Sequence, residues 1–440
     1  MSSSSASSSS SASGASGASA SGASADAEAA PAARPGAAAF IIVTIALDAM
    51  GIGLILPVMP ELLRDIAGVE VSEAAVWGAL LSFSYAGMTF LMSPLMGGLS
   101  DRYGRRPVLL LSLGALCIDY IVMSMAHTLW LLFLTRLVAG TCAATYSTAN
   151  AYLADVSPPE KRAANFGLVG AGFGIGFVLG PAAGGLLGEL GPRAPFVAAA
   201  ILAGLNMLFG LLVLPESLPK ARRRAVDLSK LDPFRALRDA ARLPGLSGLL
   251  AAMFVYSLAH SVYPAIWSYY ALAQFGWTPG QIGISLAAVG VAMALGQGLL
   301  IRWMLKRFRE PGTILLGMAA NVISMVVLIA PPGGWVVYAF LPLLGIGIVT
   351  GPAINGLMSA RAPEDVQGRL QGVVGSLQGV TSILAPLLFG GVFWLTTHEG
   401  AAMVLPGAPF AIAALLTLLA AVPIARTIGG RGRAAVQSNR

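Results

Sequence analysis

Three charged side chains fall inside long apolar stretches of this sequence: Asp48, Asp119 and Arg136. A charged side chain is costly in the hydrocarbon core of a membrane, and such residues commonly mark a functional site. Protonation of a carboxyl group removes most of this cost, so both aspartates are suited to bind and release protons as a cavity opens and closes. Arg136 can also pair with one aspartate merely to satisfy both charges. The chemistry that these residues favour is proton transfer.

The stretches around these charges have the length and composition of transmembrane helices. Of the 440 residues, 56% are hydrophobic and only 11% are charged, whereas soluble domains carry about 25% charged residues. A helix needs about 20 apolar residues to cross a bilayer, and by this criterion we count twelve spans. They are residues 38–60, 75–97, 107–126, 129–152, 164–188, 194–214, 245–271, 281–303, 312–330, 334–358, 370–395 and 404–425. The predicted fold class is an all-α membrane protein.

Lysine and arginine residues gather in alternate loops between these spans. With the N-terminus in the cytoplasm, Arg105, Lys306 and the basic run 220–224 lie on the cytoplasmic side, and only Arg64 and Arg193 lie on the other. This distribution follows the positive-inside rule and predicts a multi-pass protein with both termini in the cytoplasm. The basic run is better explained as a topology determinant near anionic lipid than as a nucleic-acid site. We therefore expect the lipid bilayer, and no nucleic acid, as a partner.

The second half of the sequence repeats the first. One constant offset aligns Gly167 with Gly372 and Pro181 with Pro386, without a gap. The repeat predicts two six-helix bundles of the same orientation, with a binding site between them near the middle of the membrane. The predicted regions are a disordered Ser/Ala/Gly-rich cytoplasmic tail (1–37), an N-terminal bundle (38–214), a cytoplasmic linker (215–244), a C-terminal bundle (245–425) and a second cytoplasmic tail (426–440).

Five glycines recur at intervals of four residues in the fifth predicted span: Gly172, Gly176, Gly180, Gly184 and Gly188. In a soluble helix each glycine would cost about 1 kcal/mol relative to alanine. In a membrane, small residues at this spacing let two helix backbones come into contact. We expect this span to pack tightly against a neighbouring helix, and packing alone is a sufficient explanation for the glycines.

Two motifs resemble signatures of the major facilitator superfamily. The loop 2–3 signature is matched by the run from 98 to 106, with Gly98, Asp101, Arg102, Gly104, Arg105 and Arg106. The fifth-helix motif of its drug/proton antiporters is matched by residues 172–185, with Gly176, Gly180, Pro181, Gly184 and Gly185. More narrowly, residues 47–66, 118–120, 151–167, 283–290 and 367–389 resemble tetracycline efflux proteins. The resemblance covers nearly the whole chain after residue 38.

This resemblance implies a major facilitator fold that acts as a monomer in a bacterial inner membrane. It places Asp48 and Asp119 on acidic positions linked to transport, and Arg136 on an arginine implicated in proton transfer. The implied function is secondary active export of tetracycline-like drugs in exchange for protons. Protons are then the coupling ion and no cofactor is tightly bound. The small-molecule drug travels alone or as a chelate of a divalent metal.

The charged residues of the loop 2–3 motif have a different predicted role. Asp101 can meet the N-terminal dipole of a neighbouring helix. Its expected partners are Arg105 or Arg106, and Asp155 is in reach if the helices pack as in the family. Such a cluster would latch the two halves on the cytoplasmic side and break in the other state. A role in membrane topology alone is the plainer alternative.

The C-terminal half departs from the tetracycline pattern. Asn321 stands where the ninth-helix aspartate of the family is expected, and Met293 stands where the eighth-helix histidine is expected. The predicted spans of this half therefore hold no acid. Their polar and aromatic side chains would suit a planar, polycyclic drug, although interhelical packing and hydrogen bonding explain them equally well. The candidates for a substrate cavity are Tyr256, His260, Tyr263, Trp267, Gln297, Asn321, Asn355 and Gln378.

Other functions stay open on these residues. An exporter of other amphipathic drugs would fit Asn321 and Met293. A nutrient uptake carrier fits less well, because residues 172–185 resemble the antiporter motif. A membrane receptor that transports nothing would tolerate neutral substitutions of Asp48 and Asp119. The sequence has no P-loop, GxSxG or HExxH motif and no metal-ligand spacing, so we expect no ATP-driven transport, no enzymatic catalysis and no metal site.

Overall fold

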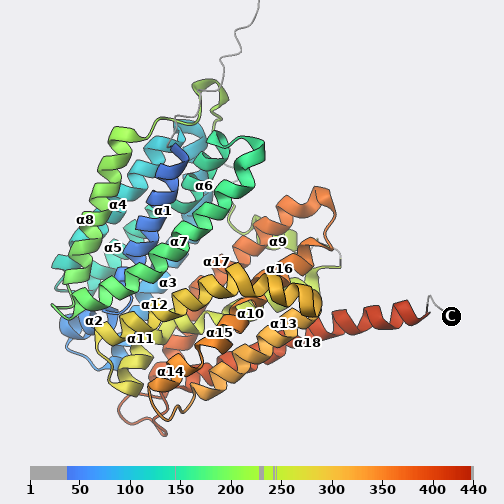
Figure 1. The fold of residues 1–440 in the computed structure, drawn as a ribbon. Helices are drawn as coiled ribbons and strands as arrows, with labels where there is room; N and C mark the ends of the chain where they lie inside the picture. Colours follow the sequence, from blue (N-terminus) through green and yellow to red (C-terminus); the bar gives the residue numbers. More distant parts are fainter. Residues whose placement is uncertain (1–36, 144, 227–231, 241–242, 244, 438–440) are drawn as a thin grey trace, which may run out of the picture. The chain divides into compact units, whose positions relative to one another are not determined.

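The computed structural model describes residues 37–143, 145–226, 232–240, 243 and 245–437, which form helices without a β-strand (Figure 1). Nearly all of the predicted N-terminal tail, 1–37, therefore lies outside the described residues. The helices before the linker are α1 (Ala37–Ile55), α2 (Met59–Ala67), α3 (Val71–Tyr103), α4 (Arg105–Met125), α5 (Leu129–Cys142), α6 (Thr145–Val156), α7 (Pro159–Gly188) and α8 (Ala194–Val213). The linker region contains a 3-10 turn (Lys220–Arg222) and α9 (Arg235–Ala240).

The helices of the second half range from 5 residues in α14 to 30 residues in α18. They are α10 (Ser247–His260), α11 (Val262–Phe275), α12 (Pro279–Leu295), a π-helical turn (Gly296–Leu300), α13 (Ile301–Val327), α14 (Trp335–Ala339), α15 (Leu341–Ile348), α16 (Thr350–Ser359), a 3-10 turn (Glu364–Val366), α17 (Gln367–Leu395) and α18 (Ala408–Gln437). The last helix thus continues beyond residue 425, where the predicted span ends.

Eleven helices of the described residues are long and apolar enough to cross a membrane, compared with twelve predicted spans. The difference arises because the predicted spans 281–303 and 312–330 fall in one helical stretch, Pro279–Val327. Within it the backbone leaves helical geometry at Arg309, with φ 57° and ψ 178°. Such a positive φ is unfavourable for a non-glycine residue, and Pro311, which has no N–H to donate, follows two residues later. The two predicted spans are therefore the two arms on either side of Arg309.

One predicted span, 245–271, consists of two helices in the structure. The chain leaves α10 at His260 and enters α11 at Val262. Pro264 provides the physical reason, because it lacks the N–H that would pair with the carbonyl group four residues earlier. Because of this break, α10 and α11 can each take their own orientation toward the helices that surround them.

The glycine row of α7 packs directly on the backbone of α1. A Cβ atom built on Gly176 would lie 2.2 Å from the carbonyl oxygen of Ala46, and one built on Gly184 would lie 2.1 Å from that of Leu54. Gly180 lies between them in the same row, and a Cβ atom there would lie 2.6 Å from the carbonyl oxygen of Met50. These distances are too short for any real side chain. The expected close packing of the fifth span on a neighbouring helix is confirmed.

The two halves of the chain meet chiefly along two helix pairs, α7 with α12 and α3 with α17, and α11 also contacts α3 and α2. A Cβ atom on Gly283 would lie 2.2 Å from the carbonyl oxygen of Pro181, and one on Gly390 would lie 2.7 Å from Cβ of Ala79. Pro181 lies in the C-terminal third of α7 and Ala79 in the N-terminal third of α3. Both are remote from Arg105, which follows the opposite end of α3. The closest backbone contacts between the halves thus lie away from the Arg105 end.

Candidate functional site

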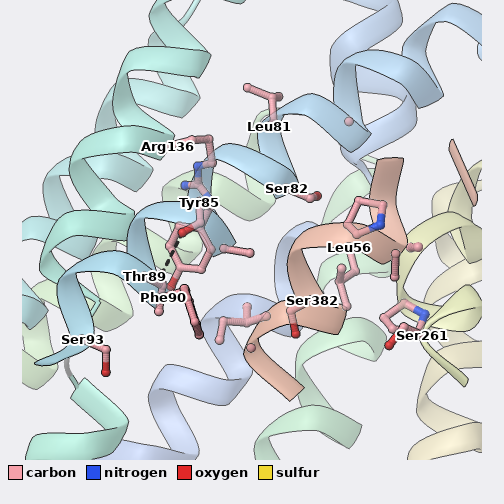
Figure 2. Close-up of a pocket in the computed structure, with 18 of the residues that line it drawn as sticks. Leu56, Leu81, Ser82, Tyr85, Thr89, Phe90, Ser93, Arg136, Ser261 and Ser382 are labelled. Carbon is pink, nitrogen blue, oxygen red and sulfur yellow. Dashed lines mark hydrogen bonds between the residues drawn. The ribbon is translucent and has the colours of Figure 1, made fainter. Parts of the chain in front are cut away.

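A cavity of about 820 Å³ is lined by residues of both halves, chiefly from α3, α11 and α17 (Figure 2). This volume is within the range of sites that hold drug-sized molecules. The walls are mainly apolar, with hydroxyl groups contributed by residues such as Ser82, Thr89 and Ser382. Among the described residues that line it, Arg136 is the only charged one. The described lining of the cavity is therefore an apolar surface with scattered hydrogen-bonding groups and a single cation.

Arg136, on α5, lies between this cavity and Asp119, on α4. Its guanidinium forms an ion pair with the Asp119 carboxylate and lies 5.5 Å from the centre of the Tyr85 ring (Figure 2). Asp119 is 3% exposed and Arg136 is 8% exposed, and Oδ1 of Asp119 has no hydrogen-bond partner among the described residues. A buried charge is tolerated only when it is paired. The pairing of Arg136 with one aspartate is confirmed, whereas a role in proton transfer stays a prediction.

Asp48 lies apart from this ion pair. It is half-buried on α1 and is not among the residues that line the cavity. Three residues further along the helix, a Cβ atom on Gly51 would lie 3.1 Å from the hydroxyl oxygen of Tyr120. Residues three apart share a helix face, so Asp48 is on the side of α1 that faces α4, where Tyr120 follows Asp119. The two aspartates thus lie on different helices, which approach each other through the Tyr120 side chain at Gly51, without a direct bond between the aspartates in the described residues.

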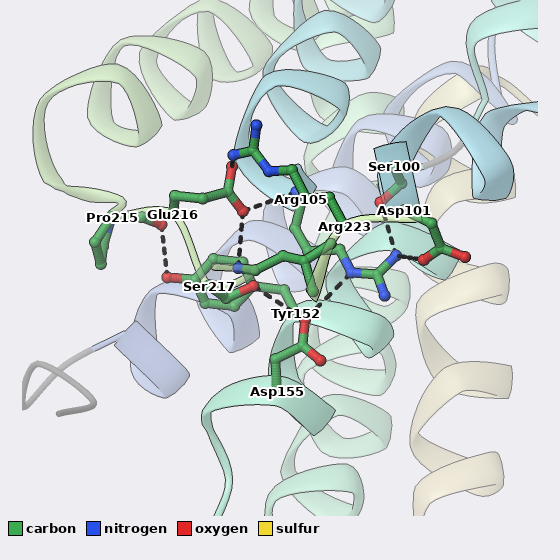
Figure 3. A network of polar contacts seen from close by, with 10 residues as sticks. Ser100, Asp101, Arg105, Tyr152, Asp155, Pro215, Glu216, Ser217 and Arg223 are labelled. Carbon is green, nitrogen blue, oxygen red and sulfur yellow. Dashed lines mark hydrogen bonds and ion pairs between the residues drawn. The ribbon is translucent and has the colours of Figure 1, made fainter. Parts of the chain in front are cut away.

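Arg105 is the centre of a polar network at the C-terminal end of α3 (Figure 3). Its guanidinium forms ion pairs with Asp101 at 2.6 Å and with Asp155, on α6, at 3.2 Å. Its backbone N–H donates to Oε1 of Glu216 at 2.8 Å, and Glu216 in turn is 3.8 Å from Arg223. Asp101 lies in the last turn of α3 rather than in a loop. The expected partners Arg105 and Asp155 are confirmed.

Gly104 makes this network possible. Its φ of 112° belongs to the region that glycine adopts far more readily than other residues, and a Cβ atom there would lie 2.2 Å from a carboxylate oxygen of Glu216. Of the remaining motif residues, Arg106 donates to the carbonyl oxygen of Leu211 at 2.6 Å. Arg102 lies over the ring of its neighbour Tyr103. Gly98 lies within α3.

Among the described residues, the predicted latch between the two halves is not formed in this conformation, which agrees with a latch that breaks in one of the two states, and the latch stays a prediction. The ion pairs of the Arg105 network among the described residues join α3, α4 and α6 to Glu216 and Arg223, which precede the second half. The physical reason is that the halves make their close contacts at the opposite ends of these helices. In this conformation the network fastens the linker to the first half instead.

The fifth-helix motif contacts both halves. Gly176, Gly180 and Gly184 face α1, whereas a Cβ atom on Gly185 would lie 2.5 Å from the carbonyl oxygen of Pro279, at the start of α12. Pro181 follows the same pattern, since its ring packs on α1 and its carbonyl oxygen faces α12. One helix therefore provides closely packed surfaces toward its own half and toward the other half.

The aromatic candidates of the second half do not line the 820 Å³ cavity. Tyr256, His260 and Tyr263 do share one face, with successive ring centres 5.9 Å and 5.5 Å apart. That face packs inside the second half, where the Tyr256 hydroxyl donates to the carbonyl oxygen of Gly347 at 3.2 Å. Trp267 also packs inside the second half, where its indole N–H donates to the hydroxyl oxygen of Ser285 at 2.9 Å. The assignment of these rings to the cavity is corrected, because the opposite face of α11 lines it.

The amide candidates also lie outside the cavity lining. Asn321 is fully buried and donates to the Tyr256 hydroxyl and to the Gly347 carbonyl oxygen, both at 3.0 Å. Asn355 exchanges hydrogen bonds with Gln371, which does line the cavity. Gln297, in the π-helical turn, and Gln378, on α17, are exposed. Interhelical hydrogen bonding, the alternative explanation, accounts for Asn321.

Sequence reasoning missed several cavity residues that a closer look at spacing could have found. Ser82, Tyr85, Thr89 and Ser93 follow one another at three- and four-residue intervals on α3, and all four line the cavity. Such spacing places them on one helix face. A polar stripe on an otherwise apolar helix is the signal. The role of Glu216 had no comparable signal in the sequence, since an acidic residue just after a transmembrane span can serve many different purposes.

The fold and this cavity define a multi-pass helical membrane transporter, and comparisons with known proteins agree. The model of the Major Facilitator Superfamily matches residues 41–386 and, in a second match, residues 249–435. The chain belongs to this superfamily. The described helices also superpose on the human organic anion transporter MFSD10, with a TM-score of 0.64 and 22% identity over 88% of this chain and 98% of that one. For the nucleoside transporter NupG the TM-score is 0.68, with 16% identity over 90% and 99% of the two chains.

Within the superfamily the chain is similar to tetracycline resistance proteins. It is 42% identical to the class C protein of Escherichia coli, over 80% of this chain and 88% of that protein. It is 40% identical to the class G protein of Vibrio anguillarum, over 80% and 89% of the two chains. The recognition made from residues 47–66 and the other quoted segments is confirmed.

Proposed function

We propose that this protein exports tetracycline-like drugs across a bacterial inner membrane in exchange for protons. The cavity opens alternately to the two sides of the membrane. The observation that supports this most is the position of Arg136, which lines the cavity and pairs with the buried carboxylate of Asp119. Substrate and proton thus act on the same pair of residues. The relatives described as tetracycline resistance proteins support the choice of drug.

Coupling follows from electrostatics. A proton that binds Oδ1 of Asp119, the oxygen without a partner, neutralises the carboxylate. Arg136 then becomes an unpaired cation at the wall of the cavity. This added positive potential expels a positively charged chelate of the drug with a divalent metal. Loss of the proton on the other side restores the ion pair and readmits the chelate.

The sidedness of the proposal comes from the positive-inside rule. The Arg105 end of the helices and both termini face the cytoplasm. The close contacts between the halves, at Pro181 and Ala79, then lie on the outer side. The described conformation is accordingly closed to the outside. The protein acts as a monomer in this cycle.

The test is drug uptake into inverted membrane vesicles, where export becomes uptake. Tetracycline uptake is measured with and without an imposed proton gradient, acid inside, for the wild type, Asp119→Asn and Asp48→Asn. We expect gradient-driven uptake by the wild type and its loss in Asp119→Asn. A well-expressed wild type without uptake would refute the tetracycline assignment. Uptake that survives Asp119→Asn but not Asp48→Asn would move the coupling role to α1.

A second candidate is proton-coupled export of a wider range of amphipathic drugs. The mainly apolar walls of the cavity favour it, as does Asn321, which is held inside the second half and is not free to select a substrate. Competition in the same vesicles separates the two. Unlabelled amphipathic drugs that lower tetracycline uptake as strongly as tetracycline itself would favour the wider range.

A further inference from the structure

The C-terminal end of α7 meets the N-terminal end of α12, and the two helices belong to different halves of the chain. A Cβ atom on Gly188 would lie 2.8 Å from Cβ of Pro279, and one on Gly185 would lie 2.5 Å from its carbonyl oxygen. Both contacts are at the end of α7 remote from Arg105. The backbones here are as close as the absence of side chains permits.

Glu189, the residue after α7, adds a charged bond to this contact. Its Oε1 accepts a hydrogen bond from the backbone N–H of Gly280 at 2.9 Å. A Cβ atom on Gly280 would lie 2.6 Å from that oxygen, so a side chain at residue 280 would make the carboxylate shift from its present position. The bond joins the first half to the second half across the closed end.

The start of α12 has one amide to offer to this carboxylate. Pro279 has no N–H, and the N–H of Gln281 donates to the hydroxyl of Thr278 in a capping box. Gly280 is left with a free amide in the first turn of a 17-residue helix. The positive end of the helix dipole favours a negative charge at this position. Glu189 satisfies that amide and that dipole from the other half of the molecule.

The electrostatic surroundings keep Glu189 ionised. Hydrogen bonds from the Thr278 hydroxyl and the Gly280 amide lower its pKa. The neighbouring Glu61, on α2, has a raised pKa, because of burial first and the Glu189 charge second, while Arg64 acts in the opposite direction. Glu189 is therefore an anion throughout the neutral range.

We propose that Glu189 is a gating residue whose bond to Gly280 holds the outer end of the cavity closed. The inference rests on the proposed alternating access. When the halves part at this end, α7 and α12 must separate, and the bond must break. A further hydrogen bond between the halves runs from the Ser268 hydroxyl to the Leu56 carbonyl oxygen, and it is uncharged. Glu189 is exposed to solvent, so it supplies a modest charged restraint that opening must overcome.

The test measures the conformation directly and uses no drug. Spin labels are placed at positions 70 and 399, which are exposed in the outer loops of the first and second halves, in full-length protein whose Cys117 and Cys142 are replaced by serine. Distances between the labels are recorded in lipid nanodiscs for the parent protein, Glu189→Ala and Glu189→Gln. We expect Glu189→Ala to raise the population with the longer outer distance about threefold. Glu189→Gln, which keeps a neutral acceptor, should have a smaller effect.

The matched control is Asp65→Ala. Asp65 is an exposed acid on the same side, and its partner at 3.6 Å is Arg193, also of the first half. Its removal should leave the distances unchanged. Equal distance distributions in Glu189→Ala and the parent, or an equal shift in Asp65→Ala, would overturn the gating role. Because no substrate is present, these outcomes are distinct from a failure of tetracycline uptake, which would refute the proposed function instead.

Discussion

Asp119 and Arg136 form a buried ion pair that joins α4 to α5 beside the wall of the cavity. The pair is almost inaccessible to solvent, and Oδ1 of Asp119, the oxygen outside the pair, has no hydrogen-bond partner among the described residues. Each charge therefore depends on the other for its burial.

Removal of Arg136 alone should be more harmful to stability than removal of both charges. Arg136→Leu leaves the Asp119 carboxylate buried without a partner, at a cost of about 3–5 kcal/mol. The double variant Arg136→Leu with Asp119→Asn has no buried charge and should regain much of that loss. Thermal unfolding in detergent measures both. Equal midpoints for the single and the double variant would contradict this account of the pair.

Tyr85 should hold Arg136 in position through its ring. The guanidinium lies 5.5 Å from the ring centre, and such contacts contribute about 0.5–2 kcal/mol. Tyr85→Phe keeps the ring and should retain gradient-driven uptake within about twofold. Tyr85→Leu should lower it by about three- to tenfold. If both variants lose uptake equally, the hydroxyl group and not the ring is what matters.

A methyl group in the glycine row should disrupt the α1–α7 contact. Gly184→Ala would place Cβ 2.1 Å from the Leu54 carbonyl oxygen, and overpacking of this kind costs about 1–3 kcal/mol. Gly174→Ala is the matched control in the same helix, because a Cβ atom there meets nothing within 4 Å. The unfolding midpoint should fall for the first variant and stay level or rise slightly for the second. A fall in both would point to a general need for flexibility in α7.

Replacement of Asn321 by the acid that the family pattern suggests should destabilise the fold. Asn321 uses its amide N–H groups to bond Gly347 and Tyr256, and an ionised aspartate has no hydrogen to donate. We expect Asn321→Asp to cost about 1–3 kcal/mol. Asn355→Asp, at the edge of the cavity, should be tolerated. Unchanged unfolding of Asn321→Asp would show that the buried amide bonds contribute little.

The stability of the protein should depend on pH through Glu61. Burial and the Glu189 charge raise its pKa in the folded chain, with Arg64 acting in the opposite direction. Protonated Glu61 is thus favoured by folding, and this stabilisation is present below its ordinary pKa of about 4.3 and lost as the pH rises through the raised value. Glu61→Gln should therefore raise the unfolding midpoint at pH 7 by about 1–2 °C and leave it unchanged near pH 4. A larger gain at pH 4 would reverse the assigned sign.

Apolar length and glycine spacing sufficed to predict most of the helices and the α7 contact, because both depend on local composition. The predicted and observed numbers of spans differ only because of Arg309. The backbone departs from helical geometry at this residue, but the two arms on either side still form one continuous helix. The pairing of Arg105 with Asp155 could be anticipated from the resemblance. Glu216 could not, since its place depends on how the linker folds back onto α4.

The faces of the second half were harder to predict. Tyr256, His260 and Tyr263 were expected at the cavity because they share a face, and they do share it. Which way that face turns depends on the break at Ser261 and on the partners Gly347 and Asn321. Periodicity gives the relative placement of side chains on one helix, but the rotation of the helix in the bundle is a tertiary property.

The contact between α1 and α7 has a mechanical consequence. Gly176, Gly180 and Gly184 bring backbone directly against backbone, with few side chains between the two helices, and such close packing makes them move together as one rigid unit. Glu189 and its bond to Gly280 lie at one end of this helix pair, and Asp48 lies along its length, on α1. A change of charge at Asp48 that tilts α1 would thus reach the outer gate without any intervening relay of side chains.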